Sequence, residues 1–256
     1  MANEIDLDIG TFNLDETNQI AISDIGRKII KKLQQSDIPK SNHSVIPPAE
    51  RSAMEIPIKG TIIGTDYDNL RTNLDALHAA LESDSEQKLT LDDDRYIMVQ
   101  YKDYGENIHG ESESIRTLAS FYFTMIASYP IWQSETLYED ERTPTSGVGY
   151  TINNPGNAPT RVKVTITAPA GGISDNCQLA NSTTATFKYR GDIAAGESLV
   201  VDNMVSQDDQ LVENDGDEDW ANVEGDFITL NPGDNTIIFT GTAGAIIKLE
   251  YRGAWL

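Results

Sequence analysis

The chain has 256 residues, of which 39 % are apolar, so it is long enough for one large or two ordinary globular domains, and we expect two. Its formal net charge of −22 argues against an ordinary nucleic-acid-binding surface, because affinity for phosphate comes from clustered lysine and arginine. No segment approaches the length of an apolar membrane span, and the acidic first fifteen residues lack an apolar signal-peptide core, so we expect neither a membrane segment nor export by that route.

The acidic charge is spread over the whole chain. Residues 1–146 hold 26 acids and 13 bases, and residues 147–256 hold 15 acids and 6 bases, which gives net charges of −13 and −9. No charged tail therefore accounts for the total. Such acidity fits a saline habitat, or a surface past which a polyanion must move without binding.

The segment from residue 20 to 48 allows two structures. An amphipathic helix would place Ile25, Ile29 and Leu33 inward, whereas a hairpin would be extended, and we favour extended structure. This segment contains the one basic cluster of the chain, which is either a solvated face or a contact with an acidic neighbour. The cluster consists of Arg27, Lys28, Lys31 and Lys32.

A strand, a turn and a helix are expected next. Met54, Ile56 and Ile58 alternate with polar residues, and Gly60 and Gly64 mark the passage to a helix that Thr65 or Asp66 can cap. The leucines of the helix fall on one stripe, at positions Leu70, Leu74, Leu77 and Leu81.

The rest of the chain shows residue patterns that are typical of strands. Residues 88–104 predict a hairpin with Asp92–Asp94 at its tip, and a long strand then runs to the break at Pro130. Residues 134–150 are polar and rich in turn formers, so we place the boundary between domains 1–146 and 147–256 there. The second domain shows short strands without a helical period, which predicts a β-sandwich.

The tripeptide Asn-Pro-Gly occurs at residues 154–156 and again at 231–233, each time before an apolar strand pattern. Proline and glycine supply the dihedral angles of a tight turn, so we interpret both segments as turns that lead into strands. A phosphate-binding loop has little support, because no lysine follows either glycine and no GxGxxG pattern is present.

No pattern of catalytic or metal-binding residues stands out. His43, His78 and His109 lack the spacing of metal ligands, and Cys177 has no second cysteine to pair with, so we expect packing or surface roles and no cofactor or metal. The alternating acids Asp215, Asp217 and Asp219 predict a solvated hairpin loop rather than a Ca²⁺ site, because the EF-hand order is absent. A glycosidase that uses two carboxylates remains an alternative, but with 41 acidic residues the sequence does not indicate which two would form a catalytic pair.

The order of these elements resembles the distal tail protein (Dit) family of long, non-contractile-tailed bacteriophages and related archaeal viruses. The resemblance covers nearly the whole chain. In the first half it rests on MEIPIKGTIIGTDYDNLRTNLDALHAAL, LTLDDDRYIMVQY and ASFYFTMIASYPIWQSE. In the second half it rests on INNPGNAPTRVKVTITAPAG, GDIAAGESLVVDNM, GDFITLNPGDNTIIFTG and IKLEYRGAWL.

This resemblance implies a mainly β (α+β) structural protein of the virion tail tip, made in the host cytoplasm. Its N-terminal domain would form a ring, usually a hexamer, and a galectin-like or jelly-roll β-sandwich would project outward. The ring would join the tail tube protein to the tip or baseplate hub protein, with a tape measure protein as a further partner, and DNA would pass through the channel without specific binding. We expect no enzymatic activity.

Two expectations follow for the ring. Acidic or neutral channel walls would let DNA pass, so we expect part of the −13 charge to face the lumen. The basic cluster Arg27, Lys28, Lys31 and Lys32 is the candidate for one of its subunit interfaces. The alternative function is carbohydrate binding at the host surface through the sandwich, with Tyr189, Trp220 or Trp255 as contacts.

Overall fold

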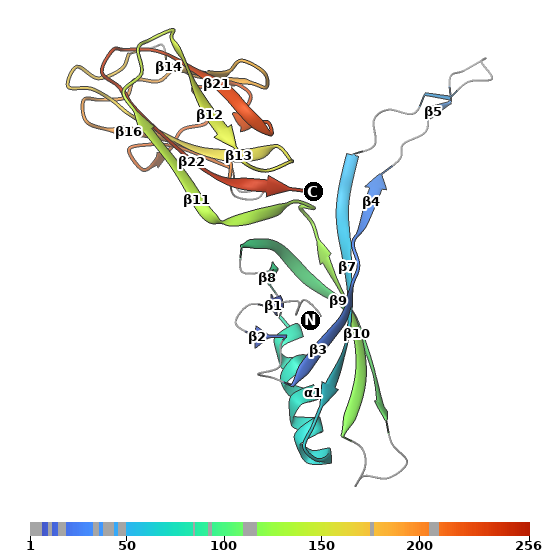
Figure 1. Ribbon diagram of the computed structural model, residues 1–256. Coiled ribbons are helices and arrows are strands. Elements are labelled where there is room, and N and C mark those ends of the chain that lie inside the picture. The colour runs from blue at the N-terminus through green and yellow to red at the C-terminus, as the bar shows by residue number, and fades with distance from the viewer. Residues whose placement is uncertain are drawn as a thin grey trace. The chain divides into compact units, whose positions relative to one another are not determined.

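The computed structural model is built mainly from β-strands (Figure 1). It describes residues 7–9, 12–14, 19–32, 36–37, 44–45, 50–83, 85–91, 94–109, 117–174, 177–204 and 210–256. The chain divides into two compact units, residues 1–132 and 133–256. The prediction of a mainly β protein is therefore confirmed, whereas the domain bounds 1–146 and 147–256 stay a prediction. Each unit is described below by itself.

The first unit contains an antiparallel sheet in the order β9, β10, β7, β3. At one edge β8 pairs with β9, β1 pairs with β8, and β2 pairs with β1. At the other edge β3 and then β4 pair with the same strand, β7. The strands are β1 (Leu7–Ile9), β2 (Phe12–Asn13), β3 (Ile20–Ile25), β4 (Lys28–Lys32), β5 (Ser36–Asp37), β6 (Ser44–Val45), β7 (Glu50–Ile63), β8 (Gln87–Leu91), β9 (Arg95–His109) and β10 (Leu118–Ala127).

These strands confirm several expectations from sequence. Residues 20–32 are extended, and β8 and β9 form the predicted hairpin, with Leu91 opposite Arg95. The expected break at Gly60 is wrong, because β7 continues to Ile63. Gly60 lies inside the ladder opposite Phe121, and a Cβ atom there would come within 2.5 Å of that ring. The glycine is therefore needed for a close approach of a side chain, as glycines inside strands often are.

Helix α1 (Tyr67–Leu81) follows β7 and lies along one face of the sheet (Figure 1). Asp66 caps it, because its Oδ1 accepts a hydrogen bond of 2.8 Å from the backbone N–H of Asn69. The predicted leucine stripe is confirmed, since all four leucines are buried. Burial of this apolar face, more than helix propensity, holds such a helix in place.

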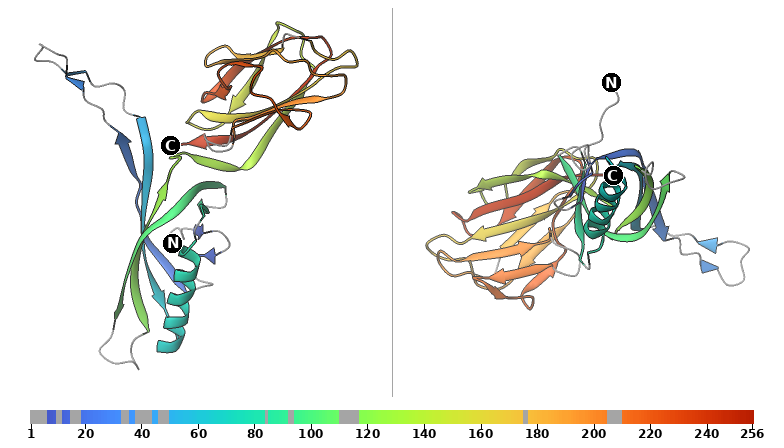
Figure 2. Two further views of the ribbon diagram at one scale, coloured as in Figure 1. Left: turned by 180° about the vertical axis from the view of Figure 1, so that it is seen from behind. Right: turned by 90° about the horizontal axis from the view of Figure 1, so that it is seen from below.

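The second unit is a sandwich of two sheets (Figure 2). One sheet has the order β18, β17, β16, β13, β22, β11, with β20 beside β13, and the other has the order β12, β21, β14, β15, β19. The strands are β11 (Trp132–Arg142), β12 (Gly149–Asn154), β13 (Thr160–Thr167), β14 (Cys177–Asn181), β15 (Thr186–Tyr189), β16 (Ser198–Asp202), β17 (Leu211–Asn214), β18 (Asp217–Glu218), β19 (Val223–Gly225), β20 (Thr229–Leu230), β21 (Gly233–Thr240) and β22 (Ile246–Trp255).

The core of the sandwich comes from both sheets. Val164 of β13 and Leu249 of β22 belong to the same buried cluster as Leu179 of β14 and Phe239 of β21. Along β13 every second residue is buried, as the alternation in the sequence predicts for a strand with one face inside. The predicted β-sandwich is thus confirmed.

Three buried asparagines hold the turns of the sandwich. Asn154 donates from Nδ2 to the carbonyl oxygens of Ala158 and Leu230, at 2.8 and 3.2 Å. Asn235 donates to the carbonyl oxygens of Asn231 and Gly233, and it accepts from Asn181 Nδ2 at 3.0 Å. Both Asn-Pro-Gly segments are therefore turns fixed by side-chain hydrogen bonds, as the sequence predicted.

Candidate functional site

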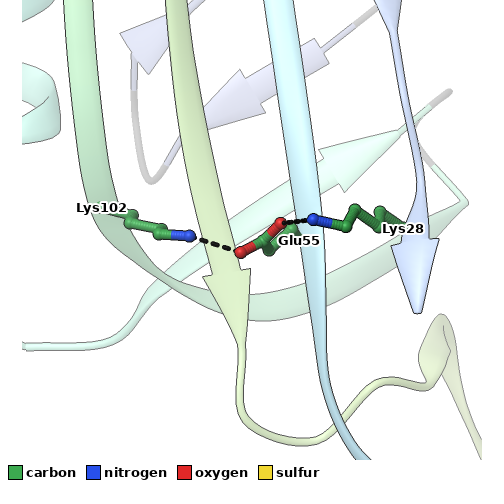
Figure 3. Close-up of polar contacts among 3 residues, drawn as sticks. All are labelled: Lys28, Glu55 and Lys102. Carbon is green, nitrogen blue, oxygen red and sulfur yellow. Dashed lines mark hydrogen bonds and ion pairs between the residues drawn. The ribbon is translucent and has the colours of Figure 1, made fainter. Parts of the chain in front are cut away.

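A carboxylate joins two lysines in the first unit (Figure 3). Glu55 of β7 lies opposite Lys28 of β4, and Lys28 Nζ is 2.9 Å from Glu55 Oε2. Lys102 of β9 binds the other oxygen of Glu55, although β10 runs between β7 and β9. The three side chains thus connect strands that are not all neighbours in the sheet.

A β-bulge places Lys102 within reach of Glu55. The ladder between β9 and β10 passes from the pair Asp103–Thr124 directly to Tyr101–Met125, which leaves Lys102 as the extra residue. A bulge redirects the side chain of the inserted residue. Here it directs the ammonium group of Lys102 to Glu55, whose side chain is only 14 % exposed.

The two lysines control the charge of Glu55. The hydrogen bond from Lys102 contributes most, and that from Lys28 adds to it, so the pKa of Glu55 falls to about 2. The same hydrogen bond raises the pKa of Lys102. Glu55 and Lys102 are therefore both charged near neutral pH.

The four predicted interface residues differ in their surroundings. Arg27 lies over the ring of Trp132, with its guanidinium carbon 4.9 Å from the ring centroid, and Lys28 is bound to Glu55. Lys31 and Lys32 lie further along β4, opposite Arg51 and Glu50 of β7. The structure thus gives Arg27 and Lys28 partners within the chain, and the role of the cluster in assembly stays a prediction.

The sheet face away from α1 carries balanced charges. Asp24 lies opposite Lys59, and Lys28 lies opposite Glu55. Lys102 and Asp103 follow on β9, so three acids and three bases share this face. Apolar side chains are also exposed there, at Ile63, Leu118 and Tyr122.

The outer side of α1 is acidic instead. Asp68, Asp75 and Glu82 are exposed and follow one another at intervals of seven residues. Positions seven apart lie on the same side of a helix, about two turns or 10 Å from each other. Arg71 is the base exposed on this helix, so the stripe is net negative.

The histidines and the cysteine have ordinary surroundings. His43 lies outside the described residues. His109 Nε2 is 2.7 Å from the hydroxyl of Ser120, and the half-exposed His78 packs edge-on against Tyr104. Cys177 is buried in the sandwich core, as expected of a packing residue, and burial raises the pKa of its thiol to about 12.

One hollow lies between the end of α1 and β9. Its volume is about 80 Å³, well below the 300–1,000 Å³ of typical ligand pockets. We therefore do not interpret it as a substrate site. Its lining residues are His78, Leu81, Glu82, Tyr101 and Tyr104.

The alternating acids form the predicted hairpin. Asp215 and Gly216, with φ of +53° and +85°, connect β17 to β18 in a two-residue turn. Asp219 accepts a hydrogen bond of 2.6 Å from the hydroxyl of Tyr189, and a second from Asn222. Among the described residues, the structure brings no three metal-ligating side chains together.

The three aromatic residues that were predicted to contact a sugar differ in their exposure to solvent. Tyr189 is 1 % exposed, so its proposed contact with a sugar is wrong: its ring fills the core, and its hydroxyl is bound to Asp219. Trp255 is partly buried. Trp220 is 42 % exposed, and its Nε1 donates to Glu218 Oε1 at 3.1 Å.

Comparisons with known proteins agree with this architecture. Residues 155–255 match the family model of the siphovirus-type tail component, C-terminal domain. No curated protein matches the chain. In the part of the chain that the structure describes, no helix is long and apolar enough to cross a membrane.

Solved structures extend the likeness beyond the second unit. The crystal structure of the Dit protein (gp 19.1) of phage SPP1 is 12 % identical, covers 98 % of this chain and 99 % of that chain, and has a TM-score of 0.73. The baseplate of phage p2 in its activated conformation with Ca is 10 % identical, covers 96 % and 97 %, and has a TM-score of 0.48. The resemblance to the distal tail protein family is therefore confirmed: residues 155–255 match its tail component domain, and the chain has the fold of a Dit protein over nearly all of its length.

Proposed function

We propose that this protein is a structural virion protein of a viral tail tip, where it forms a ring between the tail tube and the tip or baseplate hub. The match of residues 155–255 to a siphovirus-type tail component carries this proposal. The Dit fold over 98 % of the chain supports it for the first unit as well. The protein acts as a scaffold and performs no catalysis.

In this proposal residues 1–146 form the ring, as a belt domain, and residues 147–256 form an outward galectin-like sandwich. The ring is a hexamer, and its partners are the tail tube protein, the tip or hub protein and a tape measure protein. It is made in the host cytoplasm and becomes part of the virion.

An open sheet edge supports ring formation. Among the described residues, β3 and β4 pair with β7 and with no other strand, so the far edge of β3 and β4 has no partner within that part of the chain. Such an edge can pair with another chain. A cyclic ring needs two different patches that bind each other, and this edge, with Arg27 to Lys32, supplies one of them.

The charges of the first unit suit a channel for DNA. The face away from α1 is balanced, and the side of α1 is acidic, so neither side is net basic. A wall without net positive charge does not hold the phosphate backbone by counterion release. We also propose that some of the acidic residues of the first domain face the lumen of the ring.

Two experiments test this function. Gold-labelled antibody against the chain should mark the tip end of the virion tail, and label confined to the capsid or the lysate would contradict the proposal. Linear duplex DNA mixed with the purified protein at low salt should show no shift in a gel. Binding at micromolar protein would contradict a channel that DNA passes freely.

Carbohydrate binding is the second candidate, and the exposed Trp220 favours it. Exposed aromatic rings can stack on the apolar faces of ligands. A glycan array probed with the full-length protein tests this role. Binding that is lost in Trp220→Ala would support it, and no binding would leave the scaffold as the function.

A further inference from the structure

The hollow between the end of α1 and β9 is small and lined by aromatic rings. We call it the tyrosine recess. Tyr101 and Tyr104 of β9 line it together with His78 and Glu82 at the end of α1, over the buried Leu81. Its volume is about 80 Å³. A water molecule takes up about 30 Å³ in the liquid, so the recess has room for a group of a few atoms and not for a whole ligand.

The β-bulge at Lys102 brings both tyrosines to one face of the sheet. Residues three apart on a regular strand point to opposite faces. Because the bulge adds one residue, Tyr101 lies opposite Met125 and Tyr104 lies opposite Phe123. Met125 and Phe123 are two residues apart on β10 and both are buried, so they share a face. The bulge therefore builds the aromatic wall of the recess, and bulges that redirect a side chain are frequent beside functional sites.

One ring of this wall is held in place and the other is accessible. The hydroxyl of Tyr104 donates to Glu106 Oε2 at 2.6 Å, and its ring packs edge-on against His78, with 4.1 Å between the centroids. Tyr101 is 37 % exposed. The recess thus offers solvent an open phenol ring beside a fixed one.

The helix side of the recess is acidic. Glu82 is exposed, and it is the last acid of the stripe that begins with Asp68 and Asp75. The recess also lies at the C-terminal end of α1, where the helix dipole places partial negative charge. His78 is the basic side chain of the lining, and its Nε2 lies 3.5 Å from the carboxylate of Glu106. A cation in the recess would therefore be favoured.

The tyrosines themselves report this negative charge. Burial raises the pKa of Tyr101, and the carboxylates of Asp103 and Glu82 raise it further. Burial also raises the pKa of Tyr104, and the hydrogen bond to Glu106 adds to the effect. The same carboxylates that disfavour a phenolate would stabilise a positive charge beside the rings.

We propose that the tyrosine recess binds the guanidinium group of an arginine side chain from a basic partner protein. A planar guanidinium stacks on an aromatic ring and bonds a carboxylate through two parallel N–H groups, and Tyr101 and Glu82 offer these two partners together. The ammonium group of lysine is a point charge without such a plane. The net charge of −22 favours a basic protein over a second copy of this acidic chain. The inference goes beyond the proposed ring and does not depend on it.

Titration of the full-length protein with N-acetyl-L-arginine methylamide tests the site. In protein with ¹³C-labelled tyrosine, the ring signals of Tyr101 and Tyr104 should shift and saturate at millimolar concentrations of this compound. The uncharged analogue N-acetyl-L-citrulline methylamide has nearly the same shape and should leave both signals in place. Equal shifts with the two compounds, or none with either, would contradict a guanidinium site.

Variants separate the recess from a general attraction to the acidic helix. Glu82→Gln should weaken binding of the arginine compound by about fivefold or more, because it removes the paired charge and keeps the side-chain shape. Tyr101→Leu should weaken it by about threefold or more, because the stacking ring is lost. The matched control is Asp75→Asn, seven residues earlier on the same side of α1 and outside the recess. It should change binding by less than about twofold, since exposed charges act over only about 8 Å at 150 mM salt.

An equal loss in Asp75→Asn and Glu82→Gln would show that the acidic helix attracts cations without a specific site. Thermal melting shows whether each variant is folded.

Two further measurements test the source of the arginine. The peptide acetyl-Lys-Lys-Arg-Lys-Lys-amide should bind about threefold or more tighter than the equally charged acetyl-pentalysine amide, and equal affinities would contradict recognition of arginine in a basic partner. Light scattering should give the same mass for wild type and for the double variant Tyr101→Leu/Glu82→Gln. A lower mass of the double variant would assign the recess to a contact between copies of this chain and would overturn the basic partner.

Discussion

Asn154 and Gly233 are cross-strand partners, at the end of β12 and at the start of β21. The two Asn-Pro-Gly segments, far apart in sequence, therefore lie side by side. Asn154 also donates to the carbonyl oxygen of Leu230, just before the second segment. The repeated tripeptide thus builds one edge of the sandwich, which explains the repeat without a ligand.

Replacing Asn154 by alanine should destabilise the sandwich. The change removes two hydrogen bonds to buried carbonyls and one from the N–H of Gly156, so the free energy of unfolding should fall by about 2–4 kcal/mol. Urea denaturation measures this loss. The neighbour Asn153 is exposed and bonds only Asp234 through its side chain, so Asn153→Ala should cost less than about 1 kcal/mol. Equal losses in the two variants would contradict the role of the buried amide.

Gly156→Ala should also destabilise the sandwich. A Cβ atom at Gly156 would lie 1.9 Å from the carbonyl oxygen of Ala254 in β22, and backbone cannot move aside as a flexible side chain can. Overpacking of this kind costs about 1–3 kcal/mol or more. The control is Gly171→Ala, where no atom lies within 4 Å of the added carbon. A thermal melt of Gly156→Ala that matches the control would show that the two strand ends move apart freely.

Glu55→Gln should destabilise the first unit in a pH-dependent way. The folded-state pKa of Glu55 is about 2, below its ordinary value of 4.5, so its ion pairs stabilise the fold above the ordinary value. This contribution is lost as pH falls through the range from about 4.5 to about 2. The difference in melting temperature between wild type and variant should therefore shrink across that range. A difference that is constant from pH 7 to pH 2 would show that the charge of Glu55 does not matter.

The cap of α1 offers a smaller, local test. Asp66→Ala removes the oxygen that accepts from Asn69, and it should cost about 1 kcal/mol. Asp66→Asn keeps an accepting oxygen and should stay close to wild type. Urea denaturation of both variants separates capping from charge. If Asp66→Asn loses as much as Asp66→Ala, the negative charge at the helix start, and not the hydrogen bond, is what stabilises it.

Local patterns in the sequence were enough to predict the helix and several of the strands. The leucine stripe predicted α1, and alternation predicted β13, because burial of one face imposes a period on the residues that form it. Gly60 shows the limit of such reasoning. In the sequence, a glycine at this position suggests the end of a strand. In the structure it makes room for the ring of Phe121 from another strand, and only the tertiary structure reveals this contact.

The candidate site was harder to predict, because its contacts are long-range. The cluster from Arg27 to Lys32 was visible in the sequence, but its partners Glu55, Lys102 and Trp132 lie far along the chain. The bulge that directs Lys102 depends on how β9 pairs with β10, so it could not be predicted from the sequence of either strand alone. Tyr189 likewise looked available as a contact residue, because its burial depends on the packing of the sandwich.

The most direct test of ring formation is the mass of the purified full-length protein, measured by light scattering, with negative-stain images of the same sample. A hexamer of the 28.2 kDa chain has a mass of about 170 kDa and should appear as rings with a central hole. A mass of 28.2 kDa at every protein concentration, with no rings in the images, would contradict the proposal that the chain assembles into a ring by itself.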